Sequence, residues 1–265
     1  MESYENTETV LSKRNVDFKD DLRQAFIVAK YEIMKFLSGK KIFIFGAIVI
    51  GTLAILGIVM FVWGNNDIKT EEGVYNFVSF SELLFLIGAT LFSSVTLVSE
   101  FEERTALMLF TKPIRKGSIF GGKFIAAFVL NVAFMAVYFM VSAILVAIKT
   151  GGFTANVFVS MGYCIIYIFA LTGIAMLFSA LMKKSSSASI LTFVFLLLIP
   201  DIVSIVIALA ADTTDVWYMI GNASLTIPYS INGPVENGLR EALVMLVWGI
   251  VPLLGSYFLF RKREV

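Results

Sequence analysis

The sequence predicts an all-α integral membrane protein with six transmembrane helices, and three observations support this fold class. Of the 265 residues, 58% are hydrophobic and only 15% are charged, whereas a soluble domain is usually about 45–50% apolar and roughly 25% charged. The mean hydropathy of the chain is +0.86. Six apolar stretches are long enough to cross a bilayer, which takes about 20 helical residues, and they lack the alternation of barrel strands.

The chain begins with a polar stretch, residues 1–16, for which we expect a flexible cytoplasmic tail. Residues 17–41 predict an amphipathic interface helix, because apolar side chains recur at spacings of three and four. We expect this helix to lie in the cytoplasmic membrane interface, either as an anchor alone or as an anchor and a docking surface. The residues that we expect to act there are Leu22, Phe26, Lys30 and Ile33.

The expected spans make up a transmembrane domain over residues 42–260. They are residues 42–63, 78–99, 119–148, 157–182, 188–210 and 242–260. In the fifth span we expect Pro200 to break the helix and Asp201 to cap a new one. Two apolar segments, 216–220 and 225–229, are too short to cross the bilayer. They predict a re-entrant or interfacial extracytoplasmic segment before the last span.

The basic residues are distributed very unevenly between the two sides of the membrane. Eighteen of the 21 lysines and arginines fall in the N-terminal region, in the segments 100–123 and 183–187, and at the C-terminus. Positive charge stays in the cytoplasm during insertion. We therefore expect a multi-pass protein of the plasma membrane with both termini in the cytoplasm, residues 261–265 included. An even number of spans likewise requires both termini to lie on the same side of the membrane.

The segment between the second and third spans is the most informative part of the chain. It reads EFEERTALMLFTKPIRKGSIFGGK over residues 100–123 and is much longer than a turn needs to be. Acidic residues come first and basic residues last, which suits the dipole of a short helix, and Pro113 is expected to end that helix. Such a segment offers a charged surface to a cytoplasmic partner.

Three parts of this segment carry a resemblance to a known family: Glu100 through Arg104-Thr105, Lys112-Pro113-Ile114-Arg115, and Gly122-Lys123-Phe124. They resemble the signature of the type-2 ATP-binding-cassette (ABC) exporter permeases. The interface helix, the six spans and the cytoplasmic termini are similar too. The sequence departs from the commonest form of the signature at Arg104, where many members have glycine.

The resemblance implies a pore made by two permease copies, identical or related, each docked on a nucleotide-binding ATPase subunit that binds ATP and magnesium. It implies no cofactor on this chain, and cargo that is typically amphiphilic. The interface helix and the loop 100–118 would press on the ATPase subunit. The coupling residues that the resemblance assigns are Glu100, Glu102, Glu103, Arg104, Thr105, Leu107, Phe110, Lys112, Pro113 and Arg115.

Composition excludes several kinds of chemistry. With no histidine and one cysteine, the chain has no Ser-His-Asp triad, no Cys-His pair, no histidine metal site and no internal disulfide. A formal charge of +1 disfavours a partner made of nucleic acid. Residues 117–123 match the first part of a phosphate-loop pattern, but Phe124 replaces the required Ser or Thr and no strand is expected before it. We expect no enzyme activity on this chain.

Three polar residues within the expected spans are candidate pathway or gate residues: Asp201, Glu82 and Asn131. Charge inside a membrane is costly and often functional. Glu82 falls near the outer end of the second span, where reaching to water is the simpler expectation. Asp201 is either a helix cap or a contact for cargo. Asn131 either packs against a neighbouring helix or lines a pathway.

Two other classes of function stay open. A passive channel or an ion-coupled carrier predicts several ionisable residues near the middle of the bilayer, or paired broken helices in two repeats. An intramembrane enzyme needs a nucleophile, a metal cluster or a carboxylate pair at one depth. Glu82 and Asp201 fall at similar expected depths, which leaves a carboxylate pair open, although no histidine supports it.

Overall fold

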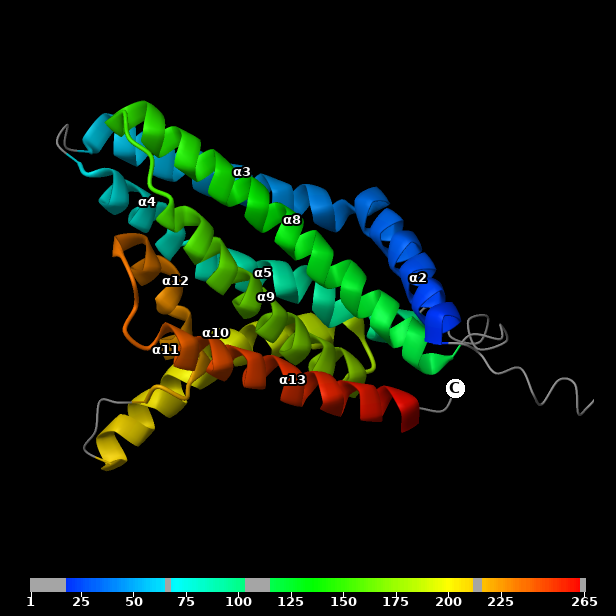
Figure 1. Ribbon diagram of the computed structural model, residues 1–265. Helices are drawn as coiled ribbons and strands as arrows, with labels where there is room; N and C mark the ends of the chain where they lie inside the picture. Colours follow the sequence, from blue (N-terminus) through cyan, green and yellow to red (C-terminus); the bar gives the residue numbers. More distant parts are fainter. Residues whose placement is uncertain (1–17, 65–67, 103–114, 212–215, 263–265) are drawn as a thin grey trace, which may run out of the picture.

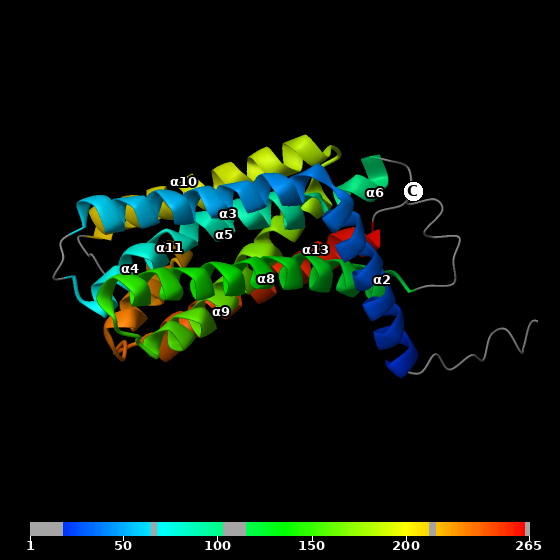
Figure 2. The ribbon, with the colours of Figure 1, turned by 90° about the horizontal axis from the view of Figure 1, so that it is seen from above.

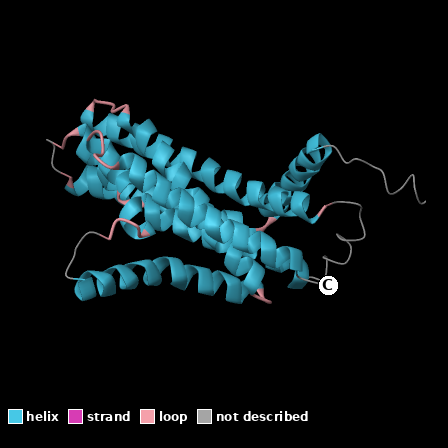
Figure 3. Cartoon of the chain, turned by 60° about the horizontal axis from the view of Figure 1, so that its bottom comes forward, coloured by secondary structure: helices cyan, strands magenta, loops and turns pink. Residues whose placement is uncertain are grey.

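The computed structural model describes residues 18–64, 68–102, 115–211 and 216–262, and those ranges contain helices and connections but no strand (Figure 3). Six long apolar helices or helix runs are candidate membrane spans, as the sequence predicts. The spans lie alongside one another, and α2 (Phe18–Ser38) crosses one end of them (Figure 2). We call this end the α2 end and the other the α11 end.

The spans vary in length and in burial. The first span is α3 (Lys40–Ile58), which η1 (Val59–Trp63) extends. The third to sixth spans are α8 (Lys116–Thr150), α9 (Asn156–Leu181), α10 (Ser185–Ala211) and α13 (Gly238–Lys262). Residues 117–123 lie inside α8 (Figure 1), so the glycine-rich stretch is helical and forms no phosphate-binding loop.

The second span differs from its expected bounds of 78–99. It is a run of α4 (Thr70–Ser79), α5 (Ser81–Phe92), η2 (Ser93–Val95) and α6 (Val98–Glu102). The helix run therefore begins before residue 78. Two glutamates in the first turn of α4 lower the local hydropathy there, although the other face of that helix is buried. Tyr138 of α8 donates a hydrogen bond to the carbonyl oxygen of Phe77 at 2.7 Å, which ties α4 to the bundle.

The second span and α9 form the centre of the bundle, while α3 and α10 lie at its edge. The backbones of α9 and α13 approach one another most closely where two glycines meet. A Cβ atom placed on Gly173 would lie 2.4 Å from the carbonyl oxygen of Gly249. Nearby, Ser256 donates a hydrogen bond to the carbonyl oxygen of Met176 at 2.9 Å. Small residues commonly allow such close contact between membrane helices.

The expected helix break at Pro200 is wrong. α10 runs through Pro200 without interruption, so Asp201 lies within the helix and does not cap a new one. Proline is tolerated in membrane helices where other groups satisfy the local backbone. Pro200 lacks the N–H that would bond the carbonyl oxygen of Leu196, and the hydrogen bond from Ser204 to the carbonyl oxygen of Pro200 at 2.8 Å adds a contact one turn further along without replacing that bond.

Three short helices fill the α11 end of the bundle (Figure 1): α11 (Ile220–Ser224), α12 (Thr226–Tyr229) and η3 (Ser230–Asn232). They pack against α4, α9 and α13. Two side chains of α9 hold them: Asn156 donates to the carbonyl oxygen of Ile231 at 2.9 Å, and Ser160 donates to that of Ile227 at 2.7 Å. These short apolar segments are therefore folded into the bundle.

Candidate functional site

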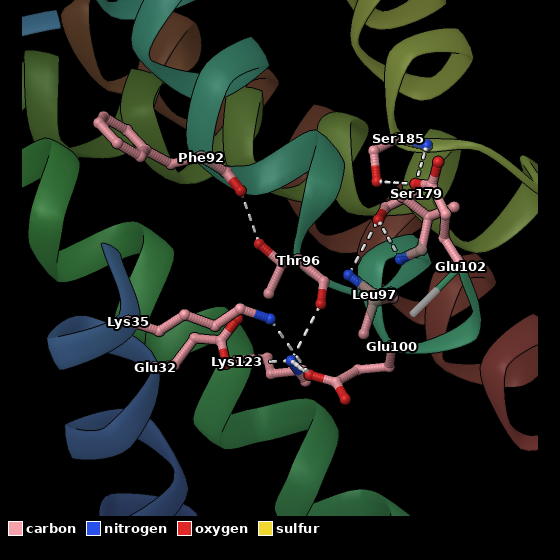
Figure 4. A network of polar contacts seen from close by, with 11 residues as sticks. Glu32, Lys35, Phe92, Thr96, Leu97, Glu100, Glu102, Lys123, Ser179 and Ser185 are labelled. Carbon is pink, nitrogen blue, oxygen red and sulfur yellow. Dashed lines mark hydrogen bonds and ion pairs between the residues drawn. The ribbon is translucent and has the colours of Figure 1, made fainter. Parts of the chain in front are cut away.

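A buried lysine joins three helices at the α2 end. Lys123, near the start of α8, is only 2% exposed. Its ammonium group donates to Glu100 Oε1 at 2.8 Å, to Glu32 Oε2 at 3.1 Å and to the carbonyl oxygen of Thr96 at 3.0 Å (Figure 4). The ammonium nitrogen of Lys35, on α2, lies 3.9 Å from Glu100 Oε1 of α6. We call Lys123, Glu32 and Glu100 the lysine cluster.

The lysine cluster fixes the position of α2 relative to the spans. A buried charge is tolerated only where paired charges and hydrogen bonds replace its water. The two carboxylates come from α2 and α6, and the ammonium comes from α8, so these three elements satisfy one another's charges. Displacing α2 would leave the lysine of α8 with one of its two carboxylates missing.

A second ion pair joins the first turns of α2 and α8. Arg115 Nη1 lies 2.7 Å from Asp21 Oδ2, and the Arg115 side chain is largely exposed. Exposed pairs contribute little stability because water competes for both groups. The pair instead marks a surface cleft of about 610 Å³ between α2, the start of α8 and the end of α13. Tyr257 and Arg261 of α13 line the opposite wall of this cleft.

Glu102 connects the end of the second span to the fifth. It accepts a hydrogen bond from the backbone nitrogen of Ser185 at 2.8 Å and another from the Ser185 hydroxyl (Figure 4). Ser185 is the first residue of α10, where backbone N–H groups lack helical partners and a negative charge is favourable. A carboxylate from another helix therefore serves as the N-terminal cap of α10.

The α2 helix packs on α8 through small residues. A Cβ atom on Gly122 would lie 2.5 Å from the carbonyl oxygen of Ala25 and 2.7 Å from Val28 Cβ, so only glycine lets the two helices come this close. The buried face of α2 contains Ala25, Ala29, Glu32 and Phe36.

The residues expected to act at the interface lie mostly on the other faces of α2. Leu22, Phe26 and Lys30 are exposed, and Ile33 is half-buried. The apolar side chains of α2 therefore lie on two faces. One face packs on the spans, and the other is exposed within the described chain. The exposed apolar side chains on this helix also include Ile27, Tyr31, Met34 and Leu37.

Most of the expected coupling residues lie outside the described residues. These are Glu103, Arg104, Thr105, Leu107, Phe110, Lys112 and Pro113. The three that the structure describes are Glu100, Glu102 and Arg115, and each is bound to another helix of the chain itself. Residues Glu102 and Arg115, the described residues on either side of positions 103–114, therefore lie at the α2 end, near the lysine cluster and the cleft. Figure 2 shows the helices α6 and α8, which carry them, meeting that end.

The two span carboxylates lie together at the α11 end. Glu82 of α5 and Asp201 of α10 line one pocket of about 370 Å³. Glu82 accepts a hydrogen bond from Ser224 of α11 at 3.0 Å, so it faces a pocket in the protein and does not simply reach to water.

The structure does not bring Asn131 to this pocket. It is fully buried, and its side-chain nitrogen donates to the carbonyl oxygen of Ala127 at 2.9 Å. A Cβ atom placed on Gly88 of α5 would lie 2.3 Å from the side-chain oxygen of Asn131. Asn131 therefore packs directly against the second span.

Sequence reasoning missed the partner of Lys123 on α2. Glu32 lies 91 positions away, and nothing in hydropathy connects the two. One signal could have indicated its burial: Glu32 continues the three- and four-residue spacing of Ala25, Ala29 and Phe36, which places a carboxylate on the small-residue face.

These features define a class of protein: a helical membrane domain with six candidate spans and a crosswise helix bound to one end. The family described as ABC-2 family transporter protein matches residues 29–200, and the chain belongs to that family. It is thus a membrane permease subunit of an ABC transporter, from a family whose membrane domains lack catalytic activity of their own and imply an ATPase partner. None of the curated proteins matches the chain.

Proposed function

We propose that this permease subunit is an exporter that moves an amphiphilic cargo across the plasma membrane with ATP hydrolysed by a separate subunit. In this proposal the α2 end is cytoplasmic and docks the ATPase subunit, with both chain termini on that side. The short helices α11 to η3 form a re-entrant segment at the extracytoplasmic end. The ATP and magnesium are held by the partner, and no cofactor is needed on this chain.

The observation that carries the proposal is the lysine cluster. A force applied to α2 or to the segment 103–114 reaches the second and third spans through buried charges, because Glu32 and Glu100 share Lys123. Glu102 extends the connection to the fifth span through Ser185. Coupling requires a contiguous physical path of this kind between the partner and the elements that move.

The exposed α2 face and the neighbouring cleft supply a surface for the partner. The cleft combines the Asp21–Arg115 pair with Arg261, so it offers charge of both signs beside the apolar Leu22. The α2 helix is in this account both a membrane-interface anchor and a docking surface, with Phe26 at its exposed face.

A second permease copy is expected against the least buried spans. α3 and α10 present exposed apolar side chains along their outer faces, among them Phe43, Ile50, Ile190 and Ile205. Apolar surface on a span can face lipid or another helix. We propose that one part of this surface pairs with a second, identical or related, copy and that the rest contacts lipid.

Deleting residues 105–110 is expected to release the ATPase subunit while the spans stay inserted. The tagged chain would be purified from its native membranes in mild detergent, and the eluate tested for ATP hydrolysis and for a nucleotide-binding chain by mass spectrometry. The matched control deletes residues 213–214, which lie in the sequence between α10 and α11. We expect the unaltered chain and the control to retain the ATPase and the 105–110 deletion to lose most of it.

Two outcomes would contradict the proposal. One is that the unaltered chain, eluting as a folded protein, carries no nucleotide-binding partner, which would favour a passive channel or carrier. The other is that the 105–110 deletion retains its partner in full.

A further inference from the structure

The pocket at the α11 end has an unusual combination of walls. Five helices supply them: α4, α5, α9, α10 and α11, with Leu225 directly after α11. About half of the lining residues are aliphatic, with leucines from α5, α9 and α10, and Glu82 and Asp201 both belong to the same pocket. None of the described lining residues is basic. The two carboxyl groups of the pocket therefore have no basic partner in its walls among the described residues.

The two carboxylates both contact α11. Glu82 accepts the hydrogen bond of Ser224, and Asp201 lies against α11, where a Cβ atom on Gly221 would come within 2.8 Å of Asp201 Oδ1. Asp201 is exposed, so the pocket opens at the surface of the bundle beside it.

A third polar group points independently to a ligand. Tyr167 of α9 lines the pocket, and it is only 6% exposed. Its hydroxyl has no hydrogen-bond partner among the described residues. The hydroxyl oxygen is itself not fully buried, so it is accessible within the pocket. A ligand with hydrogen-bond donors or acceptors would give it a partner.

We propose that this pocket binds an organic cation, a protonated amine carried on an apolar body, as the cargo of the transporter. The ammonium N–H groups would donate to Glu82 and Asp201, with the Tyr167 hydroxyl beside them, and the apolar body would lie along the leucines. The volume of about 370 Å³ falls within the range of small-molecule sites. The role as cargo rests on the proposed function, whereas binding by the pocket does not.

The test measures binding of dansylcadaverine, a fluorescent primary alkylammonium ion, to the full chain in nanodiscs of neutral phosphatidylcholine. Its N-acetylated form, which has the same fluorophore and no charge, is the matched ligand. We expect the charged probe to bind about 10- to 100-fold more tightly than the neutral one, as expected for loss of a hydrogen bond to a charged group. E82Q and D201N should each remove most of this preference.

Two further variants separate recognition from folding. E72Q removes an exposed carboxylate of α4 outside the pocket and should bind like the unaltered chain. L225W narrows the pocket at an exposed edge without touching either carboxylate, and it should weaken both probes. Equal binding of the two probes to the unaltered chain, or unchanged binding by D201N and L225W, would overturn the proposal.

The result also separates this proposal from the proposed function. If the amine binds in the pocket but no ATPase subunit accompanies the chain, the cation site is supported and the proposal of ATP-driven transport is contradicted. If the ATPase accompanies the chain but the two probes bind equally, the proposed transport function is supported and the proposal of a cationic cargo is contradicted.

Discussion

Replacing Lys123 with methionine is expected to destabilise the folded chain by about 3–5 kcal/mol, the usual cost of removing one partner from a buried ion pair. Methionine fills a similar volume, so the loss comes from two glutamates left without their ammonium group. The measurement is thermal unfolding of the purified protein in detergent, with the yield of folded protein as a second readout.

The matched control is K183M. Lys183 is an exposed lysine in the connection between α9 and α10, so its loss should leave stability within about 0.5 kcal/mol of the unaltered chain. A triple variant, E32Q with E100Q and K123M, removes all three charges and should recover much of the lost stability. If K123M unfolds like K183M, the lysine cluster does not hold the helices together.

Replacing Gly122 with alanine is expected to loosen α2 from α8. The new Cβ atom would meet the Ala25 carbonyl oxygen at 2.5 Å, and a backbone atom cannot move aside as a flexible side chain can. Overpacking of this kind costs about 1–3 kcal/mol. We expect a lower unfolding temperature and faster proteolysis of α2 in the folded protein.

The neighbouring glycine provides a sharp control. A Cβ atom on Gly121 meets no atom within 4 Å, and alanine favours the helix, so G121A should be neutral or slightly stabilising. Equal effects of G121A and G122A would mean that α2 does not pack on α8 at Gly122.

Hydropathy was sufficient to predict six candidate spans, because each helix or helix run is long and apolar, whether its side chains lie on the outside or in the centre of the bundle. Hydropathy did not indicate that the helix run continues into α4, because the burial of α4 depends on one face that packs against α8. At Pro200 the local rule predicted a break, but α10 continues through this residue, because a helix in hydrocarbon keeps the rest of its backbone hydrogen bonding.

The candidate site was predictable only in part. The described motif residues of 100–123 lie at one end of the bundle, and their partners lie in distant parts of the chain. The pairing of Lys123 with Glu32, and of Glu102 with the start of α10, depends on the tertiary fold. The shared pocket of Glu82 and Asp201 likewise required the folded arrangement of α5, α10 and α11, because expected depth alone does not show which helices are neighbours.

The most direct test of the account is photo-crosslinking from α2 in native membranes. A photoreactive amino acid would replace Phe26, which is 56% exposed, and in a separate variant Leu239, which is 79% exposed at the start of α13. We expect the probe at position 26 to form an adduct with a nucleotide-binding chain and the probe at position 239 to form none. An adduct with that chain from position 239 but not from position 26 would contradict the account.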